Sequence, residues 1–89
     1  MDKEQMTPGI AMLRVSEAIP ALMRVMPGIP VSVALEQASI MQDCVRYLTL
    51  ESALAEQGGS NLMWAAHYLS GMAKALMDDA AEGLEANRP

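Results

Sequence analysis

The stretch from Asn61 to Leu84 constrains this chain most, because its apolar residues recur at the spacing of one long amphipathic helix. The apolar side carries Leu62, Ala65, Ala66, Leu69, Met72, Ala73, Leu76, Met77 and Ala80. His67, Ser70 and Lys74 fall on the opposite side. Because Lys74 precedes Asp78 by one helical turn, the two side chains are expected to form an ion pair. The pattern predicts a helix over 61–84.

A second long helix is predicted from Ser32 to Gln57. Ser32 is a favourable N-cap, and Gly58-Gly59 is a strong stop signal, after which Ser60 or Asn61 caps the next helix. Its broad apolar stripe consists of Val33, Leu35, Ala38, Ile40, Met41, Cys44, Val45, Tyr47, Leu48, Leu50 and Leu54. A connection of about three or four residues makes the two helices antiparallel. One neighbouring helix is too narrow to cover such a stripe.

The N-terminal third contains a near-repeat, AMLRVSEAIP (11–20) followed by ALMRVMPGIP (21–30). Prolines bound the second copy and favour extended backbone in the residues before them. We therefore expect a short strand over Leu22–Met26. Over Ile10–Ala18 the sequence allows either a matching strand or a short helix. A lone strand needs a partner, which is either the first copy or the same strand of a second subunit.

The predicted fold is mainly α: an antiparallel hairpin of two long helices, preceded by a short strand or short helix, that dimerises into a four-helix bundle. Residues 1–9 are expected to form a flexible arm, 10–84 a single helical domain, and 85–89 a frayed tail. The dimer is expected because 52% of the 89 residues are hydrophobic, which is more apolar surface than so small a chain can bury alone.

Charge and composition exclude several classes of function. The net charge is −5 and the pI about 4.6, which disfavours binding to nucleic acid or to an anionic membrane surface. A single Cys cannot form an intrachain disulfide. The N-terminus lacks the apolar run of a signal peptide, and no stretch approaches the length of a membrane span. We therefore expect a cytoplasmic protein.

Residues that often carry chemistry are few, and each has a simpler interpretation. His67 is the only histidine and lacks nearby ligands for a metal site. Cys44 lies on the apolar side of its helix, where a buried structural thiol is expected. Asp78 and Asp79 form an acidic pair that we expect to be solvated or to bridge subunits. We expect no catalytic, cofactor-binding or metal-binding residues.

The larger side chains point instead to protein binding. Trp64 and Tyr68 lie four residues apart at the start of the last helix, and such rigid amphipathic groups provide much of the affinity in protein interfaces. The predicted partner-binding residues are Trp64, Tyr68, Met63, Met23 and Met26. The leading hypothesis is a non-enzymatic homodimeric regulator. The alternative is a binder of a small apolar ligand between the two hairpins.

Four runs carry a resemblance to a known family: LMRVMPGIP (22–30), ALEQAS (34–39), LTLESAL (48–54) and WAAHYLSGMAKALMDD (64–79). In these the chain resembles the DUF3077 family of small pseudomonad proteins. Met23 stands where that family usually has an aromatic residue. The family has no general assigned activity, but it is similar to a quorum-sensing antiactivator. The resemblance implies binding to the ligand-binding domain of a LuxR-type transcription factor, which would prevent its dimerisation.

Overall fold

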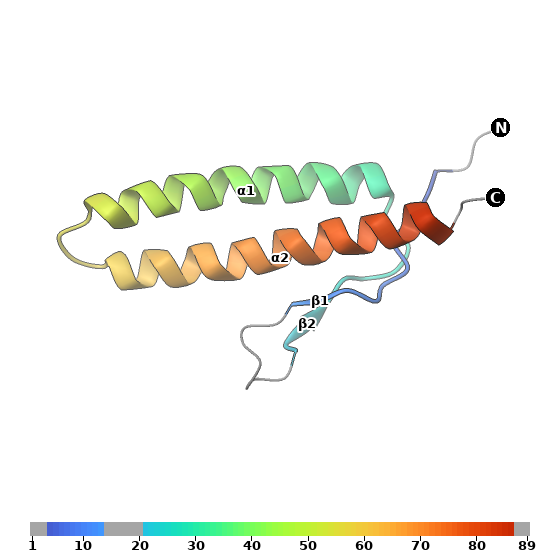
Figure 1. Ribbon diagram of the computed structural model, residues 1–89, viewed down its shortest axis with the longest axis horizontal. Helices are drawn as coiled ribbons and strands as arrows, with labels where there is room; N and C mark the ends of the chain where they lie inside the picture. Colours follow the sequence, from blue (N-terminus) through green and yellow to red (C-terminus); the bar gives the residue numbers. More distant parts are fainter. Residues whose placement is uncertain (1–3, 14–20, 87–89) are drawn as a thin grey trace.

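Two long helices lie side by side and antiparallel in the computed structural model, which describes residues 4–13 and 21–86 (Figure 1). Helix α1 spans Val31–Leu54 and helix α2 spans Gly59–Ala86. Residues 55–58 connect them, and Gly58 has a φ of 81°, which glycine adopts without the steric cost of a side chain. The predicted helical hairpin is confirmed. None of the helices in the described residues is long and apolar enough to cross a membrane.

The two helices meet along a seam. The residues that face the other helix follow one another at alternating steps of three and four. In α1 the seam contains Val31, Ala34, Ala38, Met41, Val45, Leu48 and Ser52, all buried or half-buried. In α2 it contains Leu62, Ala66, Leu69, Ala73, Leu76, Ala80 and Gly83. This spacing keeps one face of each helix toward its neighbour. The many small residues allow the backbones to approach closely.

The helix ends differ from the prediction by up to three residues. Helix α1 begins at Val31 because Pro30, which precedes it, has an extended backbone with a ψ of 134°, and the N–H of Val31 donates to the carbonyl oxygen of Gln5, at 2.7 Å. Ser32 is therefore not the N-cap, and its hydroxyl donates to Glu4. Helix α1 ends at Leu54, before Gln57.

The described part of the near-repeat contains a pair of short strands. Strand β1, Met12–Leu13, pairs antiparallel with strand β2, Met23–Arg24, so that Met12 lies opposite Arg24 and Leu13 opposite Met23. The predicted strand over Leu22–Met26 is thus confirmed at its centre. The strand partner is the first copy within the same chain. Residues 14–20, which include part of that first copy, lie outside the described residues.

Residues 5–13 run antiparallel to residues 22–31 beyond this strand pair. Thr7 is buried, its N–H donates to the carbonyl oxygen of Ile29, and its hydroxyl donates to the carbonyl oxygen of Met26. The N–H of Gly28 donates to the carbonyl oxygen of Thr7. Residues 5–9 are therefore hydrogen-bonded into the fold, which differs from the flexible arm expected over 1–9. We call residues 5–13 and 22–30 together the N-terminal layer.

The N-terminal layer is fixed to α2 by the carboxylate of Asp79. This side chain is fully buried, and its two oxygens accept hydrogen bonds from the backbone N–H groups of Gly9, Ile10 and Ala11 at 2.6–2.7 Å. The expectation that Asp79 is solvated or bridges subunits is wrong, because the backbone of a distant segment provides its partners. Asp78 does point to solvent, where it forms the predicted ion pair with Lys74 at 2.6 Å.

Small residues of α2 make room for that layer. A Cβ atom on Gly83 would overlap the carbonyl oxygen of Met6, and one on Gly71 would overlap the side chain of Leu13. Ala75 lies between these glycines and is buried. Gly83 is therefore needed for a close backbone approach and does not stop the helix. Helix α2 continues through Glu85 to Ala86, within the tail expected to fray, and residues 87–89 lie outside the described residues.

Candidate protein-binding surface

The N-terminal half of α2 carries a cluster of exposed large side chains, Met63, Trp64, His67 and Tyr68, which we call the aromatic patch. Steps of three and four residues place all four on one side of the helix. The Trp64 ring lies 5.8 Å from the His67 ring in an edge-on arrangement, and 6.1 Å from the Tyr68 ring. Each ring thus restricts the positions open to the others, which makes the patch a relatively rigid surface.

The aromatic patch is exposed because none of the residues that the structure describes covers it. The seam toward α1 is formed by Leu62, Ala66 and Leu69, so the larger side chains lie outside it. The N-terminal layer contacts α2 near its C-terminal half only (Figure 1). Trp64 remains 53% exposed and Tyr68 40% exposed. A half-exposed Trp beside a half-exposed Tyr is typical of a surface that another protein covers.

The patch also has a shallow hollow of about 280 Å³, lined by Ser60, Met63, Trp64 and His67. Ser60, Trp64 and His67 each contribute a side chain that contains a polar group to this lining, beside the apolar Met63. Apolar surface mixed with polar groups is typical of protein interfaces.

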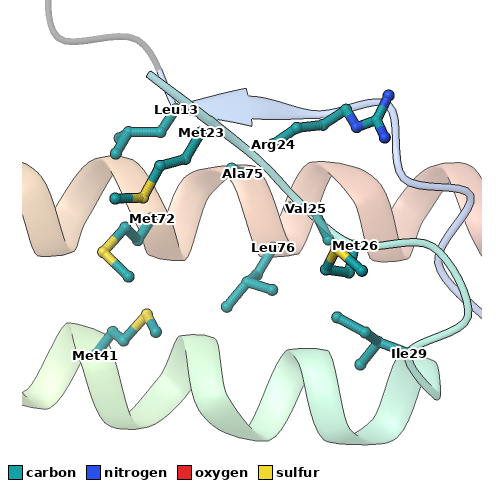
Figure 2. A pocket seen from close by; sticks show the side chains of 10 residues that line it. All are labelled: Leu13, Met23, Arg24, Val25, Met26, Ile29, Met41, Met72, Ala75 and Leu76. Atoms are coloured by element: carbon teal, nitrogen blue, oxygen red, sulfur yellow. The ribbon is translucent and has the colours of Figure 1, made fainter. Parts of the chain in front are cut away.

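Met23 and Met26 lie elsewhere, on the N-terminal layer. They line a groove of about 210 Å³ between that layer and the two helices (Figure 2). The other lining residues are Leu13, Arg24, Val25, Ile29, Met41, Met72, Ala75 and Leu76. Figure 2 shows Met23, Met41 and Met72 extending from β2, α1 and α2 toward the same space. The five predicted partner-binding residues thus form two groups.

The structure contradicts the expected position of Cys44, whereas His67 lies on the surface. Cys44 is exposed, so the expectation of a buried thiol is wrong. The reason is that the inward positions of α1 next to it are Met41, Val45 and Leu48. His67 contacts the rings of Trp64 and Tyr68. Within residues 4–13 and 21–86, no three His, Cys, Asp or Glu side chains are grouped as a metal site requires.

Sequence reasoning missed Asp79, the residue that fixes the N-terminal layer. A signal was present: Gly71, Ala75, Asp79 and Gly83 recur every four residues, and three of them are small. A carboxylate within a row of small residues indicates that backbone approaches and donates hydrogen bonds to it.

Comparison with known proteins places the chain in a family but gives no activity. A family model described as "Protein of unknown function (DUF3077)" matches residues 7–83. The match covers most of the N-terminal layer, all of α1, the aromatic patch and α2 as far as Gly83. Neither the curated proteins nor the solved structures include a match. The chain therefore belongs to the DUF3077 family.

Proposed function

We propose that this chain is a non-enzymatic regulator that binds another protein through the aromatic patch. The observation that carries the proposal is the exposure of Trp64 and Tyr68 on the half of α2 that the N-terminal layer leaves uncovered. Burying these two rings in an interface would remove a large apolar area from water. We further propose that the chain is a homodimer in the cytoplasm. The surplus of apolar residues supports the dimer, and the single free Cys44 supports the cytoplasm.

Replacing Trp64 with Ala is expected to weaken partner binding by about 2 kcal/mol, roughly 30-fold, because a central Trp loses its whole contact area. Stability should change by no more than about 0.5 kcal/mol, since the side chain is half exposed. The partner is identified by affinity purification from the source organism, and its affinity for each variant is then measured by calorimetry.

Met77→Ala provides the matched control, because Met77 is exposed on the same helix outside the aromatic patch. It should bind the partner as the unmodified chain does. Tyr68→Ala should weaken binding as well. Wild-type affinity in both Trp64→Ala and Tyr68→Ala would show that the partner binds another surface.

For the partner we propose a LuxR-type transcription factor, on the strength of the resemblance described above. The chain should bind the purified ligand-binding domain and shift it from dimer to heterocomplex in light scattering. Trp64→Ala should leave the domain dimeric. A domain that stays dimeric with the unmodified chain would remove this class of partner and leave the aromatic patch open to another protein.

A second candidate function is binding of a small apolar ligand in the groove of Figure 2. The observation that favours it is the set of three flexible Met side chains, Met23, Met41 and Met72, around one apolar space. The groove lies within a single chain, whereas the sequence suggested a pocket between two hairpins. Native mass spectrometry of protein purified from its own host should then show one bound ligand per chain, and Met72→Trp should lose this ligand. A mass that corresponds to the chain alone would exclude the ligand-binding function.

A further inference from the structure

Helix α1 carries a second stripe, about 100° around the helix from the seam toward α2, which we call the outer stripe. Its apolar members are Val33, Ile40, Cys44, Tyr47 and Leu54, all of them exposed. Gln37 and Glu51 occupy its two remaining positions. Leu54 is 71% exposed and Tyr47 65%, so the chain itself leaves these side chains in water. In Figure 1 the N-terminal layer lies beyond α2 and leaves the outer edge of α1 uncovered.

The spacing of the outer stripe is that of a helix–helix seam. Its residues follow one another at steps of four and three from residue 33 to residue 54, as do the residues of the seam toward α2. Sustained over three heptads, this pattern keeps one face of a helix against a neighbouring helix. Within one chain α2 occupies only the inner seam. Among residues 4–13 and 21–86, no other helix lies against the outer stripe.

The order of residues in the outer stripe indicates which kind of helix fits against it. Read from Val33, the order is apolar, polar, apolar, Cys, apolar, polar, apolar, and the same order of residue types is found when reading from Leu54; the two polar positions are Gln37 and Glu51. Cys44 stands at the centre. A stripe that reads alike from both ends is self-complementary when two copies run in opposite directions. We propose that α1 of a second copy of this chain covers the outer stripe, antiparallel, with the two-fold axis beside Cys44.

The charged residues favour this antiparallel arrangement over a parallel one. Antiparallel pairing brings Gln37 level with Glu51 of the partner subunit, so an amide faces a carboxylate. It also brings Asp43 level with Arg46 of the partner subunit, and both residues are exposed at the edge of the stripe. A parallel pair would instead place each charge beside its own like charge, which is unfavourable. Antiparallel helices also align their macrodipoles favourably.

This proposal rests on the homodimer of the proposed function and specifies its interface. The chain has one cysteine, so cross-linking through thiols reports on position 44 alone. A short bis-maleimide should convert most of the unmodified chain to a covalent dimer, because the two Cys44 side chains meet at the axis. Light scattering should give twice the 9.6 kDa chain mass without any cross-linker.

The control moves the cysteine to the end of the outer stripe in the variant Cys44→Ser with Leu54→Cys. Two copies of residue 54 are offset by about 20 residues in the antiparallel pair, roughly 30 Å at 1.5 Å per residue. This variant should remain dimeric in light scattering and yield almost no covalent dimer. Equal cross-linking at both positions would show a parallel pair and overturn the proposal.

A second pair of variants tests the outer stripe without cysteine chemistry. Tyr47→Glu places a charge opposite Ile40 of the partner subunit and should give a monomer at micromolar concentration. The control is Ser39→Glu, which adds the same charge at an exposed position outside the outer stripe and should stay dimeric. A dimer that survives Tyr47→Glu and does not cross-link at Cys44 would place the interface elsewhere and overturn this proposal alone. A monomeric unmodified chain would overturn the proposed homodimer, while the Trp64→Ala binding result would stand independently.

Discussion

Replacing Asp79 with Ala is expected to lower the free energy of unfolding by about 3 to 5 kcal/mol. The buried carboxylate accepts hydrogen bonds from the N–H groups of Gly9, Ile10 and Ala11, at 2.6–2.7 Å. Ala would leave three donors without an acceptor in a site that excludes water, and each lost bond to a charged group costs about 1 to 3 kcal/mol. A domain of this size has only about 5 to 15 kcal/mol of stability in total.

Asp78→Ala is the control for this prediction, because Asp78 is the neighbouring residue and has the same side chain on the exposed side of the helix. It is exposed and pairs with Lys74 across one helical turn, an interaction worth about 0.3 to 0.5 kcal/mol. Urea denaturation should separate the two variants clearly. Amide hydrogen exchange should show that Asp79→Ala loses protection at residues 9–11. Equal destabilisation by the two substitutions would contradict the structure at this point.

Asp79→Asn refines the same test. Asn keeps the size of the side chain and one acceptor oxygen, but it turns an NH2 group toward a backbone N–H that needs an acceptor. We expect a loss intermediate between those of Asp79→Ala and Asp78→Ala. The result separates the contribution of the hydrogen bonds from that of filling the space.

Most of the helical hairpin could be predicted from the sequence, because its determinants are local. The apolar spacing in 61–84, the Gly58-Gly59 stop and the pairing of Lys74 with Asp78 each depend on residues a few positions apart. The ends of the helices were predicted less accurately than the helices themselves. The start of α1 depends on a hydrogen bond to Gln5, which lies outside the helix and cannot be inferred from its sequence.

The N-terminal layer could be predicted only in part, because long-range hydrogen bonds determine its position. The proline-bounded near-repeat indicated a strand, and its first copy provides the partner. The contact of Asp79 with Gly9 joins residues 70 positions apart, and no periodicity reveals such a pair. A polar N-terminal sequence therefore resembled a mobile arm, although its backbone groups have partners in the fold.

For the candidate sites, too, the sequence predicted which residues lie together on one helix, but not which of them the rest of the fold covers. The sequence identified Trp64 and Tyr68 as an adjacent pair, but their exposure depends on how far the N-terminal layer extends along α2. For α1 the sequence predicted a stripe too broad for one neighbour. The structure divides that stripe into an inner seam and an outer one, and places Cys44 on the outer side.

Gly83 and Gly71 provide the second large effect and its matched control. Ala normally stabilises an exposed helix interior by about 1 kcal/mol relative to Gly. At Gly83, however, the added Cβ would overlap the backbone carbonyl oxygen of Met6 and lie 3.3 Å from a Val31 methyl group. At Gly71 the added Cβ would overlap a terminal methyl group of the Leu13 side chain, and that methyl group can rotate aside.

Gly83→Ala is therefore expected to lower the free energy of unfolding by about 3 kcal/mol, while Gly71→Ala should change it by less than about 1 kcal/mol. Because backbone cannot move aside as a side chain does, the N-terminal layer must separate from α2 near Met6. Urea denaturation measures the difference, and exchange of the Thr7 and Val31 amides locates it. If Gly83→Ala were as stable as Gly71→Ala, the layer would not lie against α2 as closely as the structure shows. The row of small residues would then serve helix packing, not the docking of the N-terminal layer.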